Sequence, residues 1–78
     1  MSKTRSLSDI AVDIRMNWPR PYFGAEPYIQ AMYQLEDMSD WYYMDSAKSI
    51  VLYFLSNANT WRGEDARRIK AELKGMLK

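Results

Sequence analysis

The sequence predicts an all-α fold, a compact four-helix domain, and three observations support this prediction. Apolar residues recur at the spacing of a helix over four stretches of the chain, and no stretch shows the sustained alternation of a half-buried strand. All three prolines lie within residues 19–27, between the first two predicted helices: Pro19 ends one helix, and Pro27 suits the first turn of the next. The 78 residues form a single domain, 1–78, with one modest core, and residues 1–6 are expected to be a flexible arm.

The first helix is predicted from about Asp9 to Trp18. Ser8 is a favourable N-cap because its hydroxyl can accept a hydrogen bond from the first turn, and Pro19 ends the helix. Val12 and Met16 lie off the apolar face, where they could contact another helix or a partner. The apolar face itself groups Leu7, Ile10, Ala11, Ile14 and Trp18.

A second helix is predicted to start near Glu26 or Pro27, since proline is tolerated in the first turn. The loop before it contains Gly24, and we expect Phe23 to be tucked beneath that loop. The polar residues 36–40 interrupt the apolar pattern, and we expect one short extra helical turn near 39–44. The apolar side of the second helix groups Tyr28, Ala31, Met32 and Leu35.

The third helix is predicted over about 46–58 and the fourth over about 61–77, with Asp45 and Thr60 as their N-caps. The third helix is apolar over so wide an arc that we expect it in the middle of the domain. Along the fourth, an ion-pair ladder is expected from Glu64, Arg68 and Glu72. The centre of the core is predicted at Ile50, Phe54, Ile69 and Leu73.

The composition argues against catalysis, cofactors and metals. The chain has no cysteine and no histidine, so the commonest nucleophilic thiol, general base and metal ligand are all missing. Paired carboxylates such as Asp37 with Asp40, or Glu64 with Asp65, lie in polar stretches that give no burial to separate their pKa values. We therefore predict a protein that is not an enzyme and that carries no cofactor.

The sequence shows no secretion or membrane signal. The basic residues at the N-terminus are not followed by an apolar stretch, and the longest apolar run, 50–55, is too short to span a membrane. We expect a complete, cytoplasmic small protein without membrane partners.

Charge is unevenly distributed although the net charge is only +1. Residues 21–45 carry five acids and no base, whereas residues 61–78 carry six bases and three acids. We call residues 36–45 the acidic aromatic segment. Aromatic rings surrounded by charge resemble an interface hot spot with a polar rim, and the segment could also face a basic groove. The predicted partner-binding residues are Asp37, Asp40, Trp41, Tyr42, Tyr43 and Asp45.

Alternatively, one or two of these rings could plug the end of the domain while the acids are merely solvated. Three consecutive rings cannot all enter one core, so at least one should be exposed. A second candidate surface is the basic flank of the last helix, defined by Arg67, Lys70, Lys74 and Lys78. It could contact nucleic acid, or it could be a solvated face that complements the helix dipole. The near-neutral charge, and the lack of interleaved aromatics, argue against nucleic acid.

Three stretches resemble a family of short, uncharacterised helical proteins of bacteriophages and bacterial mobile elements. They are YFGA-x-PY-x-x-AM at 22–32, MD-x-AKSIV-x-YFLSNA at 44–58, and WRG-x-x-AR-x-IK-x-ELK-x-ML at 61–77. The stretch Trp41-Tyr42-Tyr43 is more aromatic than that family leads us to expect. No functional residue follows from the resemblance.

The resemblance implies a context, because small non-enzymatic proteins of such elements are often stoichiometric inhibitors of host machinery. The function predicted is thus protein binding, as an anti-CRISPR-like or other anti-defence inhibitor of a host protein or protein complex. One alternative is a small nucleic-acid-binding protein that uses the basic flank. Another is a homodimeric accessory protein that uses Val12, Met16 or the acidic aromatic segment.

Overall fold

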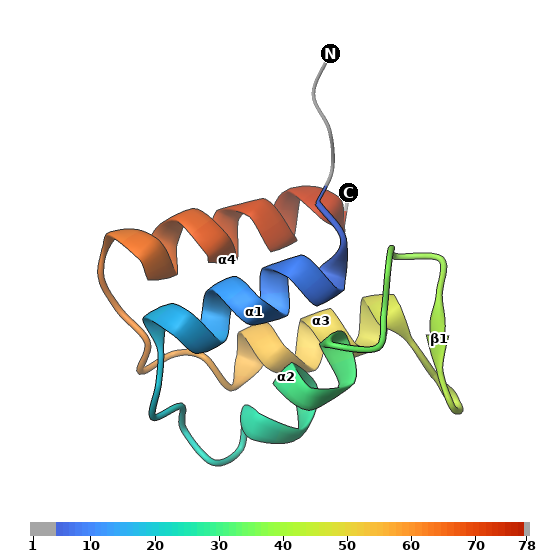
Figure 1. Cartoon of the computed structure of the whole chain (residues 1–78), viewed down its shortest axis with the longest axis horizontal. Coiled ribbons are helices and arrows are strands. Elements are labelled where there is room, and N and C mark those ends of the chain that lie inside the picture. Colours follow the sequence, from blue (N-terminus) through green and yellow to red (C-terminus); the bar gives the residue numbers. More distant parts are fainter. Residues whose placement is uncertain (1–4, 78) are drawn as a thin grey trace.

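The computed structural model describes residues 5–77, which fold into four helices and one small hairpin (Figure 1). The helices are α1 (Leu7–Asn17), α2 (Glu26–Met32), α3 (Ala47–Ser56) and α4 (Glu64–Met76). The hairpin joins β1 (Trp41–Tyr42) to β2 (Asp45–Ser46). The four predicted helices are confirmed, but the protein is not purely α-helical. Among the described residues, no helix is both long and apolar enough to cross a membrane.

Helices α1 and α3 have N-cap residues that differ from those predicted from the sequence. The hydroxyl of Ser6, not Ser8, accepts a hydrogen bond from the N–H of Asp9, and α1 therefore starts two residues earlier than expected. The hydroxyl of Ser46, not Asp45, accepts from the N–H of Ser49 at the start of α3. Serine is as good a cap as aspartate, so local sequence could not decide between adjacent candidates.

Helix α4 starts at Glu64, because Gly63 rather than Thr60 is its N-cap. Gly63 has φ 113°, a conformation that disfavours any residue with a Cβ. Trp61 therefore lies before the helix, where it is buried at the junction of α3 and α4. Its indole stacks on Trp18, and Phe54 meets both rings edge-on.

The core is formed by the predicted apolar faces. Ile50, Phe54, Ile69 and Leu73 are all buried, which confirms the predicted centre. Helix α3 is not buried on every side, however, since Leu52 and Tyr53 are about half exposed. The remaining large buried side chains include Leu7, Ile10, Ile14, Ile29, Met32, Leu35 and Val51.

A hairpin replaces the helical turn that was expected near 39–44. Trp41 pairs with Ser46 and Tyr42 with Asp45, and the N–H of Ala47 donates to the carbonyl of Asp40 (2.9 Å). The prediction of no sheet was wrong because each strand has only two residues. Strands that short contain no alternation for a pattern to reveal.

Two sets of ion pairs fasten α4 to the start of the chain, and one further pair, between Arg68 and Asp65 (3.0 Å), runs along α4 itself. Arg5 binds both carboxylate oxygens of Glu72 (3.0 and 2.6 Å), and Arg68 binds Asp13 of α1 (2.9 Å). The expected ladder is thus wrong in its residues: among the described residues Arg68 pairs with Asp65 and Asp13 in place of Glu64 and Glu72, and Glu72 binds Arg5. Of the predicted flexible arm, residues 1–4 lie outside the described residues. Arg5 is ion-paired and Ser6 caps α1.

Candidate functional site

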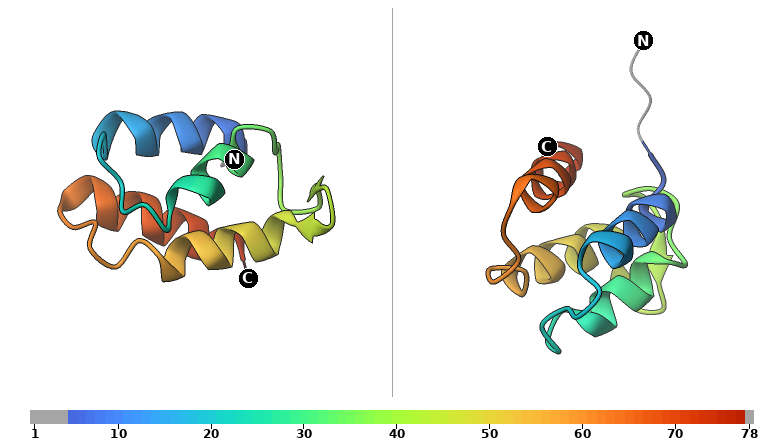
Figure 2. Two further views of the ribbon diagram at one scale, coloured as in Figure 1. Left: turned by 90° about the horizontal axis from the view of Figure 1, so that it is seen from below. Right: turned by 60° about the vertical axis from the view of Figure 1, so that its left-hand side comes forward.

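The acidic aromatic segment lies at one end of α3, where the hairpin projects beyond the helices (Figures 1 and 2). Two anchors hold it. The chain leaving α2 is tied to the start of α1, since the N–H of Leu7 donates to the carbonyl of Glu36 (2.8 Å). The hairpin then leads directly into the capped first turn of α3. A short hairpin that is fixed at both ends presents its turn to solvent.

The three consecutive rings divide as predicted between core and solvent. Tyr42 is half-buried and packs against the hydrophobic core. Trp41, Tyr43 and Met44 are exposed by 67%, 83% and 91% of their surface. The rings of Tyr42 and Tyr43 meet edge-on, with centroids 4.7 Å apart. The hairpin tip therefore places three large apolar side chains in water, and their burial by a partner would be favourable.

The backbone of Tyr43 is in an unusual conformation. Its φ is +56°, and it is the sole non-glycine residue with positive φ in the described part of the chain. This is the first central position of the two-residue turn, which glycine, asparagine or aspartate usually occupies. A tyrosine there costs stability that a glycine, which has no Cβ, would not lose. Such strain is typical of functional positions.

The acids of the segment serve two different purposes. Oδ2 of Asp40 accepts hydrogen bonds from the N–H groups of Glu36 (2.8 Å) and Asp37 (3.2 Å), so this carboxylate organises the loop. Both the hydroxyl and the N–H of Ser39 donate to Asp37, and these bonds lower the pKa of Asp37. Asp45 makes no such bond among the described residues, and it is exposed beside the tip. Asp45 is therefore the acid best placed to meet a partner.

The predicted basic flank is only partly brought together. Arg67 and Lys74 are exposed on α4, while Lys78 lies outside the described residues. Lys70 is half-buried and donates to the carbonyl of Trp61 (2.7 Å). Burial, with Lys74 and Arg62 nearby, lowers the pKa of Lys70.

Sequence reasoning missed Arg62, which lies before α4 and lines a hollow of about 420 Å³. A residue outside the helix could not be found from helical spacing alone. The hollow, which we call the basic hollow, is lined by Asn59, Trp61, Arg62, Gly63, Arg67 and Lys70.

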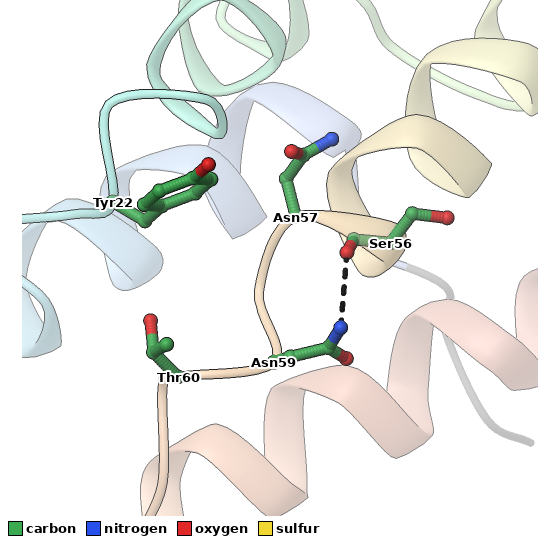
Figure 3. A pocket seen from close by; sticks show the side chains of 5 residues that line it. All are labelled: Tyr22, Ser56, Asn57, Asn59 and Thr60. Atoms are coloured by element: carbon green, nitrogen blue, oxygen red, sulfur yellow. Dashed lines mark hydrogen bonds between the residues drawn. The ribbon is translucent and has the colours of Figure 1, made fainter.

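A second hollow, the polar cleft, lies between the α1–α2 loop and the end of α3. Figure 3 shows Tyr22 on one side of it and residues from the end of α3 and the α3–α4 loop on the other. Its volume is about 370 Å³. Phe23, which we expected beneath the α1–α2 loop, is instead 80% exposed, and its main aromatic contact is with the neighbouring ring of Tyr22. The cleft is lined by Tyr22, Ser56, Asn57, Asn59 and Thr60.

Comparisons with known proteins identify no relative. No protein-family model matches the chain, and neither the curated proteins nor the solved structures contain a match. The resemblance to mobile-element proteins thus stays a prediction. Within residues 5–77, no group of three or more acids is arranged to hold a metal ion.

Proposed function

We propose that this protein acts by binding another protein through the tip of its hairpin. The observation that carries the proposal is the exposure of Trp41, Tyr43 and Met44 on a short, anchored turn. Tryptophan and tyrosine are the side chains most enriched at interface hot spots. A turn fixed at both ends loses little conformational freedom on binding, so more of the burial energy contributes to affinity.

The partner that fits this tip has an apolar pocket with a basic rim. Asp45 is exposed next to the tip, and Asp37 and Glu36 are exposed on the preceding loop. Opposite charges on the partner would steer the encounter and fix the orientation of the tip in the pocket. A basic groove of a host defence complex has this character. We accordingly favour inhibition of such a complex in the cytoplasm, the role that the sequence resemblance implies, over catalysis or cofactor binding.

The proposal predicts that the tip, and not the rest of the surface, retains the partner. The test compares proteins captured from host lysate by the wild-type chain with those captured by a Trp41→Ala, Tyr43→Ala double variant. The captured protein is then purified and its Kd measured. Loss of two hot-spot rings should weaken binding by at least about 30-fold, because even one such residue contributes about 2 kcal/mol or more and the two losses need not add.

Two variants serve as controls. Tyr53→Ala removes a ring of comparable size from the exposed side of α3, and Arg67→Glu reverses a charge on α4. Both should keep the partner. Asp45→Lys should slow association and make it less sensitive to salt, without unfolding the loop that Asp40 organises. Equal Kd values for the wild-type chain and the double variant would refute the proposal.

A further inference from the structure

The basic hollow and the polar cleft adjoin each other at the end of the molecule that faces away from the hairpin. Asn59 lines both of them, and the next three residues of the chain continue from one into the other. Helix α3, of ten residues, separates this end from the hairpin by about 15 Å. Each hollow has a volume within the about 300–1,000 Å³ range of small-molecule sites.

The basic hollow gathers three cations that form no ion pair within residues 5–77. Arg62, Arg67 and Lys70 line it, and no carboxylate does. The arginines of α1 and α4 that form ion pairs, Arg15 and Arg68, lie outside the lining. Like charges in one hollow repel each other, so this arrangement favours an anionic ligand. Arginine in particular matches the geometry of phosphate oxygens.

The polar cleft next to it is neutral and has one aromatic wall. Asn57 and Asn59 use their amide N–H groups on backbone carbonyls of α3, and their side-chain oxygens make no hydrogen bond among the described residues. Figure 3 shows the amide of Asn57 opposite the ring of Tyr22, whereas the side chain of Asn59 extends away from that ring toward Ser56. A flat ring that carries hydrogen-bond donors fits such a site, because it can lie against the tyrosine and donate to the amide oxygen of Asn57.

Gly24 makes this wall possible. A Cβ at position 24 would lie 2.6 Å from the Tyr22 ring and 2.8 Å from Oδ1 of Asn57. Because glycine has no Cβ, both the ring of Tyr22 and the side-chain oxygen of Asn57 can lie directly against the backbone at position 24. This provides a use for the loop glycine that the sequence pattern alone could not supply.

We propose that the two hollows together bind one nucleotide unit, with the phosphate against Arg62 and Arg67 and the base against Tyr22. The unit comes either from a free nucleotide or from a single-stranded nucleic acid, since both offer an unpaired base beside a phosphate. A duplex does not, because its bases are stacked and paired. The site goes beyond the proposed function of the hairpin and does not depend on it.

The test is an NMR titration of the ¹⁵N-labelled chain with a mononucleotide, a single strand of about ten nucleotides, the matching duplex, and inorganic phosphate. A mononucleotide or single strand should shift amide signals of both the polar cleft and the basic hollow. If the mononucleotide saturates as readily as the strand, the ligand is a free nucleotide; if the strand binds much more tightly, it is nucleic acid. Phosphate should shift the basic hollow alone.

Matched variants locate the site. Tyr22→Ala should weaken nucleotide binding by at least about fivefold, whereas Tyr43→Ala at the hairpin should not change it. Arg67→Glu should abolish binding, whereas Lys48→Glu, the same charge change at the far end of α3, should have little effect. Shifts that appear only in the basic hollow, or binding that Tyr22→Ala leaves intact, would overturn the proposal. Tighter binding of the duplex than of the single strand would also overturn it.

Discussion

The indole rings of Trp18 and Trp61 lie parallel, with centroids 5.1 Å apart and planes 4° apart. The two residues are 43 positions apart in the chain, and neither belongs to a helix. Phe54 of α3 meets both rings edge-on at 6.4 Å. This aromatic cluster joins the end of α1 to the approach of α4, at the end of the domain where the two hollows lie.

Phe54→Ala should unfold most of this small domain. Phe54 has no exposed surface, so truncation removes a large apolar side chain and leaves a cavity beside the stacked indoles. The expected loss in the free energy of unfolding is about 3–5 kcal/mol, measured by chemical denaturation. Tyr53→Ala is the control, because its neighbouring ring is half exposed. Similar losses for the two variants would contradict the assigned core.

The Asp13 carboxylate should make stability depend on pH. Hydrogen bonds from Arg68, and then from Arg5, lower its pKa in the folded state. Because the folded pKa lies below the unfolded one, the stabilisation is complete above about pH 5 and is lost as the pH falls through the lowered pKa. Asp13→Asn should reduce the free energy of unfolding by about 1 kcal/mol at neutral pH. That difference should shrink in acid.

Denaturation of the wild-type chain and of Asp13→Asn across the acid range measures this effect. Asp45→Asn serves as the control, because Asp45 forms no ion pair within residues 5–77. A difference between the wild-type chain and Asp13→Asn that stays constant from neutral pH to strong acid would show that the Asp13 ion pairs do not stabilise the fold.

The caps of α3 and α4 give a prediction in which sequence and structure disagree. Ser46→Ala should cost about 1 kcal/mol, because the N–H of Ser49 loses its acceptor. Thr60→Ala should cost far less, since α4 begins at Glu64 and Thr60 caps nothing. Thermal or chemical denaturation of the two variants measures both values. Equal losses would favour the cap that the sequence pattern suggested.

The sequence was sufficient for what depends on periodicity. The apolar faces of α1 and α4 were predicted correctly because each repeats over about three turns, and Leu7, Ile10, Ile69 and Leu73 are all buried. Exposure of at least one ring among Trp41, Tyr42 and Tyr43 also followed from geometry alone, since adjacent side chains cannot share one core.

Features that depend on contacts between distant residues could not be predicted in the same way. Arg68 was expected to pair along α4 with Glu64 and Glu72, yet it pairs with Asp65 and also with Asp13, which is 55 positions away. The polar cleft brings Tyr22 next to Asn57, which is 35 positions away in the chain. The sequence showed no aromatic residue interleaved with the basic flank, and it could not show that the fold places Tyr22 in the neighbouring cleft. The hairpin was not predicted either, because strands of two residues show no alternation in the sequence. The contacts that surround it are made by Asp40, whose side chain binds the N–H of Glu36 and whose carbonyl binds the N–H of Ala47.

The strained turn yields the last prediction, in which stability and binding change in opposite directions. Tyr43 has positive φ whereas Met44 does not, although both are exposed at the tip. Glycine at position 43 relieves a backbone cost of about 1 kcal/mol, while glycine at position 44 only adds freedom to the unfolded chain. Tyr43→Gly should therefore be more stable than Met44→Gly by about 1 kcal/mol in chemical denaturation.

In the partner assay the same substitution should be harmful. Tyr43→Gly removes a ring from the centre of the tip, and we expect it to weaken partner binding by at least about 30-fold although it is the more stable of the two glycine variants. The positive φ of Tyr43 lowers the free energy of unfolding, and the same turn keeps the Tyr43 ring exposed at the tip. Equal stability of the two glycine variants would show that the turn is not strained. Unchanged affinity of Tyr43→Gly would show that the strained ring does not serve binding.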